Sequence, residues 1–132
     1  MSRTSEADKT ILSAKAATGW GTAQLARSSR HLVLSVSTTG TATLTFKVAK
    51  SNSDAIPDFT STATAANHWD YVAMYDENDP SSIIAGDTGV SVAGTDIVKN
   101  YIINTDYAEH VNVQVTAFTQ GSVTAVLSTV ND

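Results

Sequence analysis

The sequence predicts an all-β protein, and two observations support that fold class. Short segments that alternate apolar and polar residues recur along the chain, and no stretch has the 3.6-residue period of an amphipathic helix of ordinary length. Of the 132 residues, 42% are hydrophobic and only 16% charged, so Ser and Thr must supply much of the polar surface. Threonine and valine favour pleated sheets. We expect a single β-sandwich of jelly-roll type with short antiparallel strands, or alternatively a small β-barrel.

Two β-hairpins are predicted. In the first, "HLVLSVS" and "TATLTFKVAK" are joined by "STTG", which closes on Gly40. Its inward residues would be Leu32, Leu34, Val36, Ala42, Leu44, Phe46 and Val48. The second joins "HVNVQVTAF", with Val111, Val113, Val115 and Ala117 inward, to "VTAVLSTV" through a turn in which Gly121 is left-handed.

Further strands are predicted in "TILSAKAA", "HWDYVAMYD" and "IVKNYIIN". The connection 51–66 is polar and rich in small residues, so we expect it to cross between sheets or to cover an edge, with Pro57 interrupting any ladder. No linker divides the chain. The predicted organisation is an extended amino-terminal arm, residues 1–10, followed by one sandwich domain, residues 11–132.

Charge and composition exclude several classes of partner. The net charge of −5 lacks the basic footprint of nucleic-acid binding, so no nucleic-acid partner is expected. The chain has no cysteine, which removes disulfides, thiolate metal sites and cysteine nucleophiles. Neither an apolar secretion signal nor an apolar run long enough to span a bilayer is found. We therefore expect synthesis in a cytoplasm and no membrane partner.

The triplet Asp87-Thr88-Gly89 is the signature around the catalytic carboxylate of aspartic proteases. In those enzymes it follows hydrophobic strand residues, whereas here Ala85 and Gly86 precede it. The same triplet is common in plain turns, because Asp bonds nearby backbone amides and Gly accepts a positive φ. We expect a turn in which Asp87 satisfies amides, with a retroviral-type aspartic protease as a remote alternative. No other motif indicates an enzyme, so no catalytic residue is predicted.

No metal or cofactor site is predicted. The acidic segment "DENDPSS" fails the EF-hand spacing, since Pro80 and Ser81 stand where a ligand and a glycine are needed, although a looser calcium loop stays open. The histidines His31, His68 and His110 have no second ligand at metal-binding spacing. We interpret the acidic segment as an exposed turn initiated by Asp-Pro.

The aromatic residues are the candidate contact residues. Trp69, Tyr71 and Tyr75 are two and four positions apart, so in one strand they would share one face. A core or subunit interface is the favoured interpretation of that face over a carbohydrate platform. Trp20, between two glycines, is expected to be an exposed contact residue. The full set of interface candidates is Trp20, Arg27, Arg30, Trp69, Tyr71 and Tyr75.

The order of "NHWDYVAMYD", "GDTGVSVAGTD", a strand with Asn104 and "VNVQVTAFTQGSVTAVLS" resembles small β proteins encoded among the structural genes of tailed bacteriophages. The resemblance covers residues 10–130. It implies a capsid decoration (cement) protein without catalytic residues, located in the virion after synthesis in the host cytoplasm. The implied partners are the major capsid protein or other virion proteins and further copies of the chain, a trimer being one candidate. A head-fibre or tail-associated module that binds host glycans is the alternative.

Overall fold

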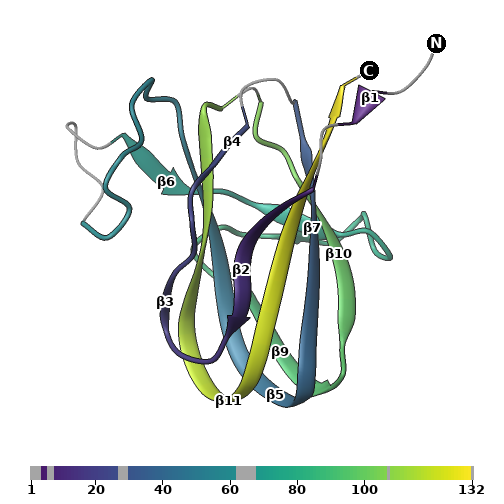
Figure 1. Ribbon diagram of the computed structural model, residues 1–132. Coiled ribbons are helices and arrows are strands. Elements are labelled where there is room, and N and C mark those ends of the chain that lie inside the picture. Colours follow the sequence, from purple (N-terminus) through teal and green to yellow (C-terminus); the bar gives the residue numbers. More distant parts are fainter. Residues whose placement is uncertain (1–3, 6–7, 27–29, 62–67, 107, 132) are drawn as a thin grey trace.

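The computed structural model describes residues 4–5, 8–26, 30–61, 68–106 and 108–131, and every regular element in this part of the chain is a β-strand (Figure 1). The all-β prediction is confirmed. In chain order the strands are β1 (Thr4–Ser5), β2 (Lys9–Lys15), β3 (Gly19–Trp20), β4 (Gln24–Leu25), β5 (Leu32–Ser51), β6 (Trp69–Tyr71), β7 (Met74–Asp76), β8 (Ile83–Ile84), β9 (Val90–Thr95), β10 (Val98–Ile103) and β11 (His110–Asn131).

Two long strands, β5 and β11, organise the fold. They pair antiparallel from Ser51 opposite His110 to Leu32 opposite Thr129. Both bend at the same end of the molecule, where Gly40 and Gly121 have φ values of 69° and 89° (Figure 1). The ribbon that they form therefore folds back on itself, and its two arms become the centres of two facing sheets.

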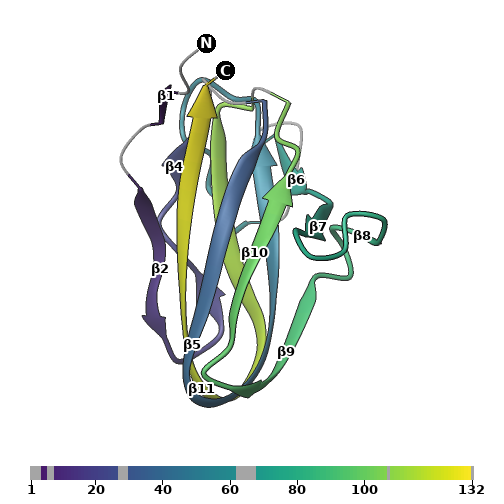
Figure 2. The same cartoon turned by 90° about the vertical axis from the view of Figure 1, so that its right-hand side faces the viewer.

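Further strands pair with each arm along its edges. Sheet I contains the first half of β5 and the second half of β11, with β2 along β11, β10 along β5, then β7 and β8. Sheet II contains the second half of β5 and the first half of β11, with β3 and β4 along β11 and with β9 and β6 along β5. Figure 2 shows these layers with β8 and its loops projecting to one side.

The main core lies between the sheets and follows the predicted alternation. Leu34 and Leu127 of sheet I and Phe46 and Val113 of sheet II are almost completely buried. Phe46 meets Tyr101 edge to face, with ring centroids 5.7 Å apart, and so joins the two sheets. The burial of apolar side chains in this layer is the main driving force for folding.

Both predicted hairpins are wrong in their pairing. The runs on either side of Gly40 do turn back, but each pairs with β11 in a different sheet, and the same holds for the runs around Gly121 and their pairing with β5. Ala117 was expected inward and is exposed, because the register shifts between Val115 and Ala117. The alternating pattern determines which side chains face the core, but it does not determine the partner strand.

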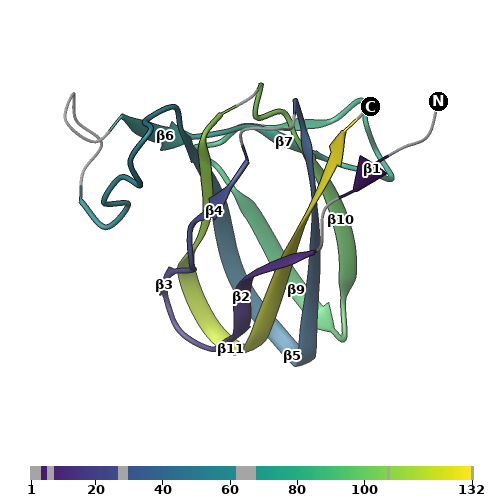
Figure 3. The same ribbon diagram turned by 45° about the horizontal axis from the view of Figure 1, so that its top comes forward.

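The segment "HWDYVAMYD" also differs from its prediction. It forms β6 in sheet II and β7 in sheet I, and the chain passes between the sheets at Val72 and Ala73 (Figure 3). Of the predicted arm, Thr4 and Ser5 pair with the end of β11, and Lys9 and Thr10 already belong to β2. Residues 1–3 and 6–7 lie outside the described part.

Candidate binding site

A second apolar cluster lies outside the main core, on the outer face of sheet II. Trp20 and Lys47 each lie directly opposite Gln114, and directly opposed residues in a ladder share a face. Gln114 lies between the buried core residues Val113 and Val115, so this shared face points away from the core. The next outward positions bring Ala49 opposite Tyr71, and Ala49 is fully buried. We call the rings gathered over Ala49 the aromatic cluster; they are Trp20, Phe59, Trp69 and Tyr71.

The rings of the aromatic cluster have a defined arrangement. The planes of Trp20 and Tyr71 are parallel within 5°, with centroids 6.4 Å apart. Trp69 stands nearly perpendicular to both, at 5.3 Å from Trp20 and 5.4 Å from Tyr71. Phe59 packs against Trp20 and Trp69. Phe59 and Trp69 are buried, whereas Trp20 and Tyr71 remain partly exposed, so the first pair supports the second.

Polar contacts hold Tyr71 in place. Its hydroxyl donates a hydrogen bond of 2.7 Å to Oε1 of Gln114, and the ammonium of Lys47 lies 4.8 Å from the centre of its ring. Burial raises the pKa of the Tyr71 hydroxyl, and the nearby charges of Asp87 and Asp70 raise it further. The phenol therefore stays protonated as a donor to Gln114 at neutral pH.

The motif "GWG" positions Trp20. A Cβ on Gly21 would lie 2.1 Å from the carbonyl oxygen of Ile11, so only glycine permits this approach of the chain to β2. The amide of Gly21 donates to the carbonyl of Val113, and Nδ2 of Asn112 donates to the carbonyl of Gly21. Trp20 is thus fixed to sheet II by its neighbours.

Phe59 comes from the predicted crossing segment 51–66, of which residues 62–66 lie outside the described part. Phe59 packs on the outer face of sheet II as part of the aromatic cluster. Asp58 stabilises the turn that contains Phe59, because its carboxylate accepts hydrogen bonds from the amide and hydroxyl of Thr60. These bonds lower the pKa of the Asp58 carboxyl. Sequence reasoning missed Phe59, although one large apolar residue in a polar loop was a signal.

The turn that contains Asp87-Thr88-Gly89 packs against the same face. The amides of Thr88 and Gly89 both donate to the carbonyl of Ala85. A Cβ on Gly86 would lie 2.9 Å from the backbone of Tyr71 and Val72, and a Cβ on Gly89, whose φ is 71°, would lie 2.5 Å from the carbonyl oxygen of Phe46. The two glycines let the turn approach sheet II, and this approach brings Asp87 to the aromatic cluster.

The predicted role of Asp87 is wrong. The turn is present, but within the described structure no backbone amide donates to the exposed Asp87 carboxylate. Asp96 does bond turn backbone, because its Oδ1 accepts the amide of Gly40 at 2.8 Å. Asp87 instead lines a surface pocket with the aromatic cluster.

The pocket has a volume of about 420 Å³, which is in the range of small-molecule sites. The aromatic cluster forms its apolar wall, and its polar lining consists of Thr60, Ser61, Asp70, Asp87 and Gln114. Trp69 is 9% exposed, and its indole Nε1 is buried without a hydrogen-bond partner within the described structure. A buried indole N–H usually has a partner, so this donor is an exception among the buried polar groups of the described structure.

Replacing Asp87 with asparagine is expected to lower the pKa of Tyr71, because the Asp87 charge contributes to the raised value. Ultraviolet titration of tyrosine ionisation would show one of the four tyrosines shifting to lower pH. The same substitution in a Tyr71→Phe background should leave the remaining titration curve unchanged. An identical curve for Asp87→Asn and the parent would contradict the placement of Asp87 beside Tyr71.

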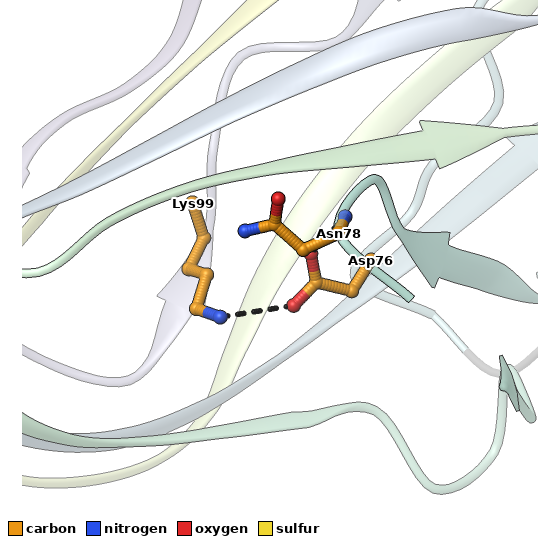
Figure 4. A network of polar contacts seen from close by, with 3 residues as sticks. All are labelled: Asp76, Asn78 and Lys99. Atoms are coloured by element: carbon orange, nitrogen blue, oxygen red, sulfur yellow. Dashed lines mark hydrogen bonds and ion pairs between the residues drawn. The ribbon is translucent and has the colours of Figure 1, made fainter. Parts of the chain in front are cut away.

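The acidic segment forms a turn stabilised by a lysine (Figure 4). Asp76 pairs with Lys99 at 3.0 Å and accepts the amide of Asn78, while Asp79 accepts the hydroxyl of Ser81. The Asn78 amide, and then Lys99, lower the pKa of Asp76. In the part of the chain that the structure describes, no group of three or more His, Asp or Glu side chains is arranged to hold a metal ion.

The described residues among the remaining sequence candidates do not line the pocket. Tyr75 is in β7 of sheet I, so the prediction that it shares a face with Trp69 and Tyr71 is wrong; the change of sheet at Val72 separates them. Arg30 is exposed, and its carbonyl accepts the amide of Asp106. Arg27 lies outside the described residues. Of the histidines, His31 and His68 are exposed and His110 is buried.

Comparison with known proteins adds a fold relative. No family model matches the chain, and no curated protein matches it in sequence. The solved structure of the SPBc2 prophage-derived protein YomS is similar, with a TM-score of 0.67 over 99% of this chain and 96% of that one, at 15% sequence identity. This likeness shows a shared fold over the whole of both chains.

Within the described residues, no helix is long and apolar enough to cross a membrane.

Proposed function

We propose that this protein is a structural component of a bacteriophage particle. The observation that carries the proposal is the shared fold, over nearly the full length of both chains, with a prophage-derived protein. The resemblance of the strand segments to phage structural proteins supports the same origin. The finer proposal is a decoration protein that binds the head and stabilises it through many copies of one surface contact.

The outer face of sheet I supplies a surface for contact between copies of the chain. Val33, Ile102, Tyr75 and Ile83 are successive partners across four strands, so their side chains form one apolar row on the face opposite the core. Ile83 is 66% exposed, and Val98, on the same face of β10, is 72% exposed. An outer sheet face is usually polar, and a continuous apolar row on it is typical of a protein contact.

We propose that the apolar row is the contact between copies of the chain. Ile83→Asp is expected to convert the oligomer to a monomer in analytical ultracentrifugation, because it places a charge in an apolar interface. Ile56→Asp is the matched control, since Ile56 is 65% exposed in the loop after β5 and lies outside the row. A monomeric parent protein, or an Ile83→Asp variant that associates like the parent, would contradict this contact.

Particle location tests the function itself. Phage particles induced from the strain that encodes this chain would be purified and labelled with gold-conjugated antibodies against it. We expect regular labelling of the head surface. Labelling confined to the tail would overturn the decoration role but retain the virion role. A protein abundant in the lysate and missing from purified particles would refute both.

A binding module on a head fibre or tail, recognising host glycans, is the second candidate. The pocket on sheet II favours it, because aromatic rings and polar groups line one exposed recess. The protease alternative has less support. The carboxylates of an aspartic protease dyad share a buried site, whereas Asp87 is exposed on the rim of an aromatic pocket.

A further inference from the structure

The aromatic cluster has no role in closing the main core. The core between the sheets is filled by its own set of aliphatic side chains with Phe46 and Tyr101, and the cluster is separate from it on the outer face of sheet II. Trp20 and Tyr71 keep part of their rings in solvent. Partly exposed aromatic rings are a large apolar surface to leave uncovered on a sheet, and such a surface is typical of a binding site.

The cluster is also preorganised. Trp69 holds the parallel rings of Trp20 and Tyr71 from a perpendicular position, and the Tyr71 hydroxyl is tied to Gln114. Gln114 is the ladder partner of Trp20, so one residue links both rings to the sheet. A ligand that binds here would not have to order these side chains first, which saves conformational entropy.

The polar lining indicates the chemistry of the ligand. Asp70 and Asp87 offer carboxylate oxygens, Gln114 an amide and Thr60 a hydroxyl, beside the unpartnered N–H of Trp69. A ligand with one apolar face and several hydroxyl groups satisfies both parts of this lining: its C–H face covers an aromatic ring, and its hydroxyls bond the polar groups. Pyranose sugars have this structure.

Two other ligand classes fit less well. A quaternary ammonium ion would bind aromatic faces but makes no hydrogen bonds, so the amide and the hydroxyl would lose water without gaining a partner. An acidic sugar would meet two carboxylates, and the ammonium of Lys47 already lies over Tyr71. The two carboxylates therefore disfavour an anionic ligand, and the hydroxyl groups of a neutral sugar satisfy the hydrogen-bonding groups of the lining.

We propose that this pocket binds a neutral pyranose ring of a glycan, stacked on Trp20 and hydrogen-bonded by Asp70, Asp87 and Gln114. Trp69 and Phe59 support the stacking ring. The site deepens the second candidate function, a glycan-binding module, by naming the class of sugar and its contacts, and it does not depend on the structural role proposed above. Sugar binding is measured on the purified chain, and particle location on the phage, so either proposal can fail alone.

Both tryptophans of the chain line this pocket, so tryptophan fluorescence and the two indole N–H resonances report on it alone. The probes are methyl glycosides of glucose, galactose, mannose and N-acetylglucosamine, with N-acetylneuraminic acid and tetramethylammonium as acidic and cationic comparisons. We expect saturable shifts of both indole resonances with at least one neutral glycoside. Absence of a response to all four, or a response only to an acidic or cationic probe, would overturn the proposal.

Variants distinguish the site from a general surface effect. Trp20→Ala should weaken the effective glycoside by about tenfold or more, Trp20→Phe less, and Asp87→Asn measurably. Phe118→Ala is the matched control, because Phe118 is a partly buried ring that packs against the main core and lines neither the pocket nor the apolar row. Trp20→Ala with unchanged affinity would refute the stacking role. If Trp20→Ala fails to fold, unchanged affinity in both Trp20→Phe and Asp87→Asn would refute the proposed site.

A sedimentation experiment identifies the source of the sugar. The chain would be mixed with purified, insoluble bacterial cell walls and sedimented, with and without the effective glycoside. Sedimentation that the glycoside reverses identifies a wall glycan as the source. Binding of the free glycoside without sedimentation identifies a soluble sugar. Sedimentation that the glycoside does not reverse would contradict recognition of walls through this pocket.

Discussion

Replacing Phe46 with alanine is expected to lower the free energy of unfolding by about 3–5 kcal/mol, which is a large part of the ~5–15 kcal/mol of a typical domain. Phe46 is 1% exposed and contacts Tyr101 across the two sheets, so its removal leaves a cavity where the sheets meet. Urea denaturation followed by circular dichroism would measure the loss. The melting temperature should fall by roughly 10 °C or more.

Ile56→Ala is the control for this prediction, because Ile56 is exposed on a loop and its removal should change stability by less than about 0.5 kcal/mol. Phe46→Leu keeps most of the volume and should cost less than Phe46→Ala. Equal stabilities of Phe46→Ala and Ile56→Ala would mean that the core between the sheets is not arranged as described.

Replacing Gly121 with alanine is the second large effect. The φ of Gly121 is 89°, and an added Cβ would lie 2.6 Å from the Cβ of Ala42 and 2.9 Å from the carbonyl oxygen of Thr41. A left-handed alanine costs about 1–2 kcal/mol, and the steric overlap adds roughly 1–3 kcal/mol. The bend of β11 against β5 should therefore be strongly destabilised, again measured by urea denaturation.

Gly40→Ala provides a matched comparison at the same bend. Gly40 has a φ of 69°, but an added Cβ would meet no atom within 4 Å, so only the backbone strain of about 1–2 kcal/mol is expected. The difference between the two variants isolates the packing of Gly121 against β5. A loss for Gly40→Ala that equals or exceeds the loss for Gly121→Ala would contradict the observed bend.

The alternation of apolar residues predicted which side chains form the core. Leu32, Leu34 and Val36 are buried as expected, and so are the apolar positions from Ala42 to Val48. A strand has two faces, so a period of two residues is enough to assign them. The left-handed conformation of Gly121 also follows from its residue type, because glycine alone adopts it without steric cost.

The pairing of strands was not predictable in the same way. Gly40 and Gly121 each mark a reversal of the chain, and a local reversal normally makes a hairpin. Here each glycine bends one long strand, and the partner of both halves of β5 is β11, which lies 59 residues away at the pair Ser51–His110 and 97 at the pair Leu32–Thr129. The residues next to each glycine carry no information about a partner strand so far along the chain.

The binding site, too, was predicted only in part from the sequence. Trp20, Trp69 and Tyr71 were expected to be contact residues from their type and spacing, and the structure brings these three together. Phe59, Gln114 and Asp87 were not assigned to the site, because they come from a loop, a central strand and a turn that are far apart in the chain. Tyr75 was assigned to the same face and is in the other sheet.

The sequence by itself determined the all-β class, most of the inward positions of the two long strands and the left-handed positions that need glycine, because these depend on a residue and its near neighbours. The tertiary structure alone decided that two bent strands build both sheets, and that the Asp87 turn lies against the aromatic cluster. Those features depend on contacts between residues far apart in the chain. Gly86 and Gly89 illustrate both contributions. The sequence shows that they have no side chain, but only the folded chain shows that this lets the Asp87 turn approach sheet II.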